Sequence, residues 1–561
     1  MKLPALPAKA GQKITLGQLV GSSLALVAAR LTREANRPVL LVTADTPSAL
    51  RLEQELSFLL ADQGCPVLMF PDWETLPYDT FSPHQDIISQ RLETLYTLPQ
   101  MSSGVLIVPI STLMLRTAPQ AYLDKYSLMV TSGQRLNLQQ LRGRLAEAGY
   151  VAVEQVLEHG EFAARGSLLD LFPMGSSRPY RIDFFDDEVD SIRPFDPESQ
   201  RSSEPVKSVS LLPAREFPTD EAAIELFRGQ FREQFELSRA EGSVYQEVSK
   251  GRWPAGIEYY LPLFFSQTAS LFDYLPDNTL LLTVGEIYPA AQRFWNDIGQ
   301  RYEDRRWDNT RPLLPPQQIY LPVEQLFAAL GQYGAVRLQE AATDGGAGQH
   351  DLPIAPLPDL QLDHSKEQPL LALSQFLQGF AGRTLFAVES EGRREGLGDL
   401  LARINLQPKE FASLEEFVGS KARHGLLVSP LERGFLLEPA GAEALALITE
   451  TELLGGKIRS KRQREKSKNL SSDAVIRNLG ELTQGQPVVH LDHGVGRYLG
   501  LETLDAGGLP TEFLTLEYAG GDKLFVPVTN LHLISRYTGS DNPPSHKLGG
   551  EAWVKARRKA A

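Results

Sequence analysis

The sequence has a single cysteine, Cys65, in 561 residues, which excludes a fold held together by intrachain disulfide bonds. It also lacks an apolar run long enough to cross a membrane, since stretches such as PVLLV and TLLLTV have the length of a strand. The opening residues, MKLPALPAKAGQ, lack the apolar core of a signal peptide. Together these absences predict a cytoplasmic protein without a membrane span.

The chain also lacks an excess of positive charge. Its net charge is −14, from 56 Lys and Arg residues against 70 Asp and Glu residues, whereas a surface devoted to nucleic acid is normally basic. Basic residues are concentrated in 457–468, a predicted flexible tether, and in 547–561, so any DNA contact is expected near the C-terminal end. With 42% hydrophobic and 22% charged residues, the composition is that of an ordinary globular protein of about four domains.

Residues 14–115 alternate helical and strand patterns, which predicts a parallel sheet with helical cover. Helices are expected at 14–35, 46–64 and 85–98, and strands at 38–45, 67–71 and 104–110. Further on, 343–360 is rich in Gly and Pro and predicts an exposed linker.

A nucleotide site would belong in the first turn of this domain. A phosphate loop needs glycines, a Lys for the β- and γ-phosphates and a Ser or Thr for magnesium. Gly17 and Gly21 are suitably placed, but no lysine follows them, and Gly285 and Glu286 replace the Asp-Glu pair that ends the matching strand of working P-loop ATPases. We therefore expect a degenerate site, without hydrolysis, made of Gly17, Gly21, Ser22, Ser23, Gly285 and Glu286.

The stretch 159–197 holds two runs of alternating residues, RGSLLDLFP and PYRIDFFDDEVDSI, separated by the turn-forming MGSSRP. This pattern predicts paired strands with one half-buried face. Arg181, Asp183 and Phe185 share the face opposite the core. That face is either a solvated surface, on which Arg181 pairs with Asp183 or a neighbouring carboxylate, or a protein-docking surface, because Arg and aromatic residues anchor interfaces.

Residues 482–537 show short strand patterns and Gly-rich turns without a helix signal, which predicts a small β-barrel of the SH3-like or Tudor-like kind. Within GLETL, Glu502 and Leu504 face opposite to their neighbours, and a leucine on an edge that can pair with another chain is a recognition residue. His490 and His493 lie close together, but without further ligands nearby we expect no metal site.

Long ungapped strings carry a family resemblance. GEFAARGSLLDLFP and PYRIDFFDDEVDSI resemble the domain of UvrB that docks on UvrA, and GQPVVHLDHGVGRY with KLFVPV resembles a CarD-like RNA-polymerase-interacting domain. The whole chain is similar to the N-terminal half of the bacterial transcription-repair coupling factors, the Mfd family. The resemblance implies that Arg165, Arg181 and Phe185 contact UvrA, and that Leu504, with Glu502 beside it, contacts the RNA polymerase β subunit.

The expected fold class is multidomain α/β, with an inserted α+β domain like domain 2 of UvrB and a C-terminal barrel. The boundaries that we expect are 1–120 and 213–345 for a degenerate P-loop domain, 121–212 for the inserted UvrA-docking domain, 346–360 for a linker, 361–455 for an α/β domain of unknown role, 456–474 for a basic linker, 475–540 for the CarD-like barrel and 541–561 for the start of a connector helix.

The resemblance implies an adaptor of transcription-coupled DNA repair, which binds stalled RNA polymerase and recruits UvrA without a catalytic residue or cofactor of its own. In the family, ATP and magnesium serve a DNA translocase that releases polymerase and makes most DNA contacts. Its motifs are absent here, so we expect a shortened, monomeric form. Two alternatives stay open: an active UvrB-like P-loop ATPase acting on damaged DNA, and a regulator acting only through the barrel.

Damage recognition itself is not expected. The loop DWETLPYDTFSP offers only Trp73, Tyr78 and Phe81 as stacking candidates, and acidic residues surround them. Base stacking needs aromatic side chains beside positive charge, so this composition argues against a grip on damaged DNA.

Overall fold

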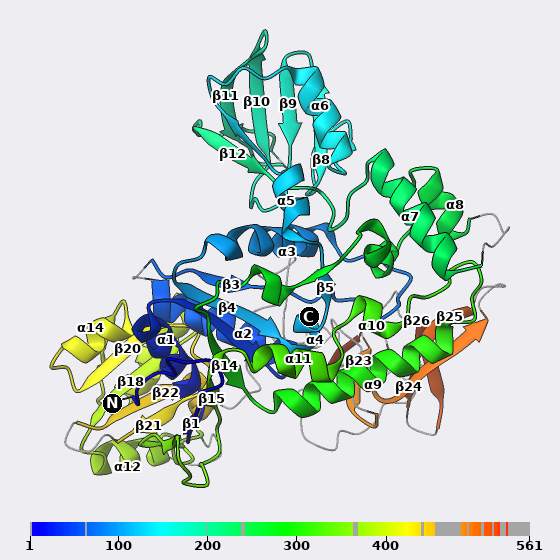
Figure 1. Ribbon diagram of the computed structural model, residues 1–561. Helices are drawn as coiled ribbons and strands as arrows, with labels where there is room; N and C mark the ends of the chain where they lie inside the picture. Colours follow the sequence, from blue (N-terminus) through cyan, green and yellow to red (C-terminus); the bar gives the residue numbers. More distant parts are fainter. Residues whose placement is uncertain are drawn as a thin grey trace. The chain divides into compact units, whose positions relative to one another are not determined.

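The structure of the chain is a computed structural model (Figure 1). It describes residues 3–61, 64–197, 199–236, 242–362, 369–438, 443–454, 484–490, 493–505, 510–518, 521–527 and 534–536. The chain divides into two compact units, one of residues 1–356 with 435–443 and the other of residues 357–434 with 444–561. In the described ranges, no helix has both the length and the apolar character that crossing a membrane requires.

A seven-stranded sheet forms the centre of the first unit, and every pairing within it is parallel. In spatial order its strands are β16 (Gln349–Asp351), β1 (Lys13–Gly17), β15 (Gly334–Leu338), β14 (Leu280–Val284), β2 (Pro38–Thr43), β4 (Gly104–Pro109) and β3 (Val67–Met69). All residues of β2 and β4 are buried, as their continuous apolar sequences predict for central parallel strands. The expected parallel sheet is confirmed.

Helices and short strands of the first unit connect and surround this sheet. They are α1 (Ser23–Ala35), α2 (Thr46–Leu60), α3 (Gln85–Thr97), η2 (Leu98–Gln100), α4 (Ile110–Leu113), β5 (Arg116–Thr117), α5 (Gln120–Tyr126), α7 (Glu221–Gln234), α8 (Val244–Ser249), η3 (Ile257–Phe264), β13 (Ala269–Ser270), η4 (Leu271–Tyr274), α9 (Ile287–Arg305), α10 (Pro316–Ile319), α11 (Val323–Leu330), and the antiparallel pair β17 (Ile354–Ala355) and β21 (Phe435–Leu437).

One prediction about this unit was wrong, and another was incomplete. The helix expected over 14–35 begins only at Ser23, because Ile14 and Leu16 are buried and pair with β15 as part of strand β1. The linker expected over 343–360 is only partly irregular, since residues 349–351 form the edge strand β16 along β1. In both cases pairing with a distant strand decided the conformation, and local sequence patterns do not contain that information.

The inserted domain lies between α5 and α7 in the sequence (Figure 1). Its five-stranded sheet has the order β11 (Glu188–Pro194), β10 (Tyr180–Phe185), β9 (Leu168–Leu171), β8 (Glu161–Arg165) and β7 (Val151–Ala152). Helix α6 (Leu138–Glu147) and the two-stranded ladder of β6 (Leu128–Thr131) and β12 (Ser208–Leu211) complete it. The predicted pairing of β9 with β10 is confirmed, but the second alternating run turns back at 186–187 and forms two strands.

The second unit contains a parallel α/β arrangement and a separate antiparallel sheet. The first has the strand order β19 (Lys409–Phe411), β20 (His424–Val428), β18 (Arg383–Val388) and β22 (Leu445–Thr449), with α12 (Leu371–Gly379), α13 (Glu391–Ala402), α14 (Leu414–Gly419) and α15 (Glu450–Leu454). The antiparallel sheet has the order β26 (Lys523–Pro527), β25 (Pro510–Glu517), β24 (Gly494–Asp505), β23 (Pro487–His490) and β27 (Ile534–Arg536).

The mixed α/β character of the chain is confirmed, and the C-terminal sheet is compatible with part of a small barrel. The finer assignments, to a P-loop-type domain, a UvrB-like domain and an SH3-like or Tudor-like barrel, stay predictions. The predicted tether at 457–468 and the predicted connector helix at 541–561 lie outside the described residues.

A candidate protein-docking surface on the inserted domain

The three residues predicted to contact UvrA lie on one face of the five-stranded sheet. Arg165 lies across from Leu168 on β9, and Leu168 lies across from Asp183 on β10. Since alternate residues of a strand share a face, Arg181, Asp183 and Phe185 are on the same side as Arg165. The intervening Ile182 and Phe184 are fully buried against the core, as the alternation predicted.

Arg181 is held by a neighbouring carboxylate, that of Asp170 on β9. Its Nε donates to Asp170 Oδ1 at 2.7 Å and its Nη2 donates to Asp170 Oδ2 at 2.9 Å. These bonds raise the pKa of the Arg181 guanidinium. The carbon at the centre of that group lies 4.9 Å from the centre of the Phe195 ring. The sequence left pairing with Asp183 or another carboxylate open, and the structure selects Asp170, directly across from Arg181.

Phe185 and Arg165 lie at hairpin ends of the same sheet. Phe185 ends β10 and is 75% exposed, the largest exposure among the large hydrophobic residues described. Arg165 ends β8, is exposed, and donates from Nη2 to the backbone carbonyl of Glu154. The turn after β8 is bonded to the end of β10, since the Phe184 amide donates to the Ser167 carbonyl at 3.0 Å. Both side chains therefore project from one end of the sheet.

The outward face carries a small apolar cluster of its own. Val156, Ala163, Phe172 and Phe195 are buried there, apart from the main core. Arg181 borders this cluster through Phe195, so it is only partly accessible, with 24% of its side chain exposed. The alternation predicted a uniformly outward face and did not reveal this cluster, although two aromatic residues were a usable signal: Phe172 at the end of the first alternating run and Phe195 just after the second.

Two polar contacts fasten the inserted domain to α3. The His159 ring lies between Asp86 Oδ1 and the Ser176 carbonyl oxygen, 2.7 Å from each, and its hydrogen bond holds the pKa of Asp86 below the ordinary range. Arg91, fully buried, donates from Nε to Glu216 Oε1 at 2.8 Å. Because Glu216 follows the last strand of the insertion, this ion pair fixes the point where the chain returns to the main sheet.

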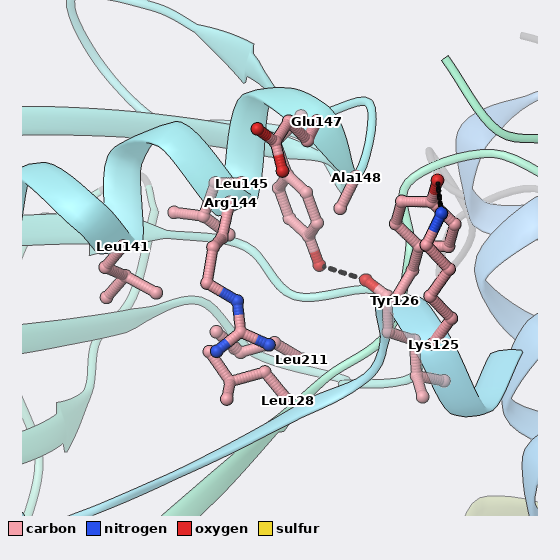
Figure 2. A pocket seen from close by; sticks show the side chains of 11 residues that line it. Lys125, Tyr126, Leu128, Leu141, Arg144, Leu145, Glu147, Ala148 and Leu211 are labelled. Carbon is pink, nitrogen blue, oxygen red and sulfur yellow. Dashed lines mark hydrogen bonds between the residues drawn. The ribbon is translucent and has the colours of Figure 1, made fainter. Parts of the chain in front are cut away.

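A recess on the inserted domain, of about 110 Å³, lies away from the docking face. Its wall includes Leu141 and Leu145 of α6 and Leu211 of β12, with the Arg144 guanidinium near Leu211, whereas the Lys125 amino group lies on the opposite side and donates to the Tyr126 hydroxyl (Figure 2). Leu141 and Leu145 belong to the same buried core as Ile182 and Phe184. The recess is thus on the core side of the sheet and includes none of the predicted docking residues.

The loop where a nucleotide would bind is occupied by the chain itself. The amide of Gln18 donates to the Ala341 carbonyl at 3.1 Å, and that of Leu19 donates to the Gln339 carbonyl at 3.1 Å. A Cβ atom added at Gly17 would lie 2.8 Å from the Ala341 oxygen, so the segment after β15 packs directly on the loop. Two amide groups of the loop, those of Gln18 and Leu19, are therefore already bonded to backbone carbonyls rather than available to a phosphate.

The serines that follow this loop have internal partners as well. The hydroxyl of Ser22 donates to Glu55 Oε1 at 2.6 Å, and both residues are buried. The hydroxyl of Ser23 donates to the Val20 carbonyl at 2.6 Å, and Ser23 is fully buried. A carboxylate therefore lies at the start of α1, where a bound phosphate would require positive charge.

The second part of the predicted nucleotide site consists of Gly285 and Glu286, which follow β14. Gly285 has a φ of 75°, a left-handed conformation that glycine adopts without strain, and it carries no side chain to hold magnesium. Glu286 is exposed at the start of α9 and forms an ion pair with Arg337 of β15. The structure thus offers one exposed carboxylate, already paired, beside the end of β14.

The aromatic residues of the loop at 72–83 are mostly part of the core. Trp73 is buried and its indole nitrogen donates to Glu216 Oε2 at 2.7 Å. Tyr78 is buried, its hydroxyl donates to the Leu314 carbonyl at 2.9 Å, and burial raises its pKa. Only Phe81 is exposed among the three stacking candidates. One exposed ring does not form the row of aromatic side chains that stacks successive bases.

The predicted polymerase-binding positions lie on β24. Glu502 is exposed and pairs with Phe513 of β25, and Leu504 pairs through its backbone with Thr511. On the other edge, the ladder with β23 ends at Arg497. His490 and His493 contact each other with ring centres 4.8 Å apart. In the described part of the chain, no group of three or more His, Cys, Asp or Glu residues is placed to hold a metal ion.

Comparison with known proteins finds three matching family models. The UvrB interaction domain matches residues 128–217, the MFD D3 domain matches residues 376–453, and the CarD-like/TRCF RID domain matches residues 482–538. The first match contains the sheet with Arg165, Arg181 and Phe185, and the third contains β24.

The chain is also similar over its length to proteins called transcription-repair-coupling factor. It is 51% identical to that of Escherichia coli (strain K12) over 559 residues, covering 99% of the chain and 48% of that protein. It is 48% identical to that of Haemophilus influenzae over 561 residues, covering 100% of the chain and 48% of that protein, and 28% identical to that of Bacillus subtilis (strain 168) over 573 residues. The chain spans about half the length of the curated relatives it matches.

Proposed function

Because this chain is the counterpart of the N-terminal region of the transcription-repair-coupling factors, we propose that it is an adaptor of transcription-coupled DNA repair. The inserted domain recruits UvrA, and the C-terminal sheet binds RNA polymerase. The observation that carries the proposal is the presence of two interaction-domain matches, at 128–217 and 482–538, on one chain. Two sites on one chain raise the local concentration of one partner near the other.

UvrA recruitment is supported by the surface around Phe185. An aromatic ring that is 75% exposed at the end of a rigid hairpin is available for insertion into an apolar pocket. Arg165, exposed at the neighbouring hairpin end, adds a cation on the same face. Aromatic and Arg residues are the side chains that most often dominate binding energy at interfaces.

Polymerase binding is supported by the edge of β24. Hydrogen bonds to Gln486 continue the pairing with the β23 side as far as Tyr498, while β25 pairs with β24 up to Asp505. Within the described residues, the edge from Gly500 to Asp505 has no second strand. We propose that the polymerase β subunit adds a strand here, with the positions of Glu502 and Leu504 supplying specificity.

We propose that this part of the protein neither binds nor hydrolyses a nucleotide. The occupied amides of Gln18 and Leu19, the Ser22–Glu55 bond and the Glu286–Arg337 ion pair support a degenerate site that takes neither ATP nor magnesium. ATP, magnesium and most DNA contacts belong to a translocase elsewhere in the full-length family. We further propose that the adaptor acts as a monomer in the cytoplasm.

The test is simultaneous capture by the immobilised chain of purified UvrA and RNA polymerase. Wild type should retain both, Phe185→Ala should lose UvrA and keep polymerase, and Leu504→Arg should lose polymerase and keep UvrA. Each variant is the folding control of the other. If wild type fails to retain UvrA or fails to retain RNA polymerase, the adaptor function is contradicted. If one variant loses both proteins, the proposal of two separate binding sites is contradicted.

A further inference from the structure

We propose that Asp170 is a positioning residue of the docking face: it holds the Arg181 guanidinium in one orientation, so that UvrA meets an ordered cation. The inference rests on the proposed function of the inserted domain. Asp170, whose carboxylate is buried, would thus contribute to the recognition of UvrA without touching it.

The contact between the two residues is fixed by the sheet. Asp170 and Arg181 lie directly across from each other on β9 and β10, so backbone pairing sets their separation. Asp170 is 6% exposed, whereas Arg181 keeps 24% of its side chain accessible. The carboxylate accepts two parallel bonds, from Nε at 2.7 Å and from Nη2 at 2.9 Å. This two-bond geometry fixes the plane of the guanidinium as well as its position.

The remaining contacts of Arg181 are weaker and face outward. Nη1 lies 3.4 Å from the Gln200 carbonyl oxygen, and Nη2 lies 3.4 Å from Gln200 Oε1. The Phe195 ring supports the guanidinium at 4.9 Å. A guanidinium has five N–H donors, and among the described residues the four hydrogen bonds to Asp170 and Gln200 leave one donor without an acceptor. Acceptor groups of a partner can use that donor and can also replace the long Gln200 contacts, while Asp170 keeps the group in place.

The same geometry explains why truncation of Arg181 alone is not a clean test. Removing Arg181 leaves the Asp170 carboxylate buried without its partner, which destabilises the sheet that carries Phe185 and Arg165. Loss of binding after Arg181→Ala therefore mixes a lost contact with damage to the surface. Asp170→Asn avoids this problem, because the amide is neutral, has the same shape and still accepts one hydrogen bond.

The experiment is a double-mutant cycle on the full chain, with the dissociation constant for UvrA measured by biolayer interferometry. Its members are wild type, Asp170→Asn, Arg181→Ala and the double variant, and thermal unfolding is recorded for each. We expect Asp170→Asn to weaken binding by about 3- to 10-fold, the cost of ordering one rotamer-rich side chain on binding. In the Arg181→Ala background the same change should cause no further loss of affinity, because it only removes the buried charge that Arg181→Ala leaves unpaired.

Glu147→Gln is the matched control, since it also removes one negative charge from the inserted domain but lies away from the docking face. Glu147 is an exposed residue of α6, the helix whose Leu141 and Leu145 pack on the core side of the sheet. Binding should change by less than about twofold. Nitrogen-15 labelling of arginine gives an independent reading, because Asp170→Asn should broaden or shift the Arg181 Nε–H signal in the free chain.

The outcomes separate the inference from the function on which it rests. If wild type does not bind UvrA, the proposed function fails and the inference fails with it. If wild type binds and Asp170→Asn binds equally well, only the positioning role is overturned. Equal losses for Asp170→Asn and Glu147→Gln would indicate a general charge effect, and an unchanged loss in the Arg181→Ala background would indicate damage unrelated to Arg181. Each of these results overturns the proposal.

Discussion

Truncation of Phe185 to alanine should separate binding from folding. The ring is 75% exposed at the end of β10, so its removal leaves no cavity in the core. Exposed substitutions of this kind change the free energy of unfolding by about 0.5 kcal/mol or less. The thermal midpoint of Phe185→Ala should therefore match that of wild type.

The expected loss in binding is much larger. A phenylalanine side chain buries about 200 Å² when it is fully covered. With 75% of the residue exposed in the free chain, about 150 Å² remains to be buried on docking. At about 25 cal/mol per Å² this area corresponds to at most about 4 kcal/mol, of which alanine retains a part. We expect Phe185→Ala to cost about 2–3 kcal/mol, a dissociation constant about 30- to 150-fold weaker.

Titration calorimetry with purified UvrA measures this difference, and Trp307→Ala is its matched control. Trp307 is 73% exposed in the same unit but lies outside the inserted domain, just after α9. Its truncation removes an equally exposed aromatic ring and should leave the affinity for UvrA unchanged. The reasoning is refuted if Phe185→Ala binds within about twofold of wild type, or if Trp307→Ala loses as much affinity.

Buried and interdomain contacts of the first unit give three further expectations. Ser23→Lys restores the missing lysine, yet fluorescence anisotropy should detect no saturable binding of a labelled ATP analogue with magnesium, because the amides of Gln18 and Leu19 already donate to backbone carbonyls; saturable binding would contradict the degenerate site. Glu216→Ala should lower the free energy of unfolding in urea by about 3–5 kcal/mol, because Arg91 becomes a buried cation without its carboxylate; a loss under about 1 kcal/mol would contradict the role of this pair. The hydrogen bond from His159 lowers the pKa of Asp86 in the folded chain. The bond therefore stabilises the fold at pH values above the ordinary Asp pKa of about 4, and this contribution is lost as the pH falls through the lowered pKa of the folded chain. The stability advantage of wild type over Asp86→Asn, measured by urea denaturation, should therefore shrink below about pH 4, and a difference that grew there would contradict the assignment.

Much of the local architecture followed from the sequence alone. Continuous apolar runs identified the buried strands β2 and β4, and period-two alternation placed Arg181, Asp183 and Phe185 on one face of β10. The long strings of the inserted domain and of the C-terminal sheet indicated the family that the comparisons then matched. These features are predictable because side-chain periodicity and contiguous motifs are properties of neighbouring residues.

Tertiary structure decided which groups on those faces are free to act. Alternation assigns Arg181 to a face but does not say which strand lies beside β10, so only the register with β9 shows that Asp170 holds it. The nucleotide loop is another case: its composition showed the missing lysine, but only the structure shows that the amides of Gln18 and Leu19 are bonded to carbonyls more than 300 residues away, at Ala341 and Gln339. Strand β1 escaped detection for the same reason, because its partner β15 lies equally far along the chain. A sequence carries the pattern of each element, whereas contacts between distant elements arise only when the sheets assemble.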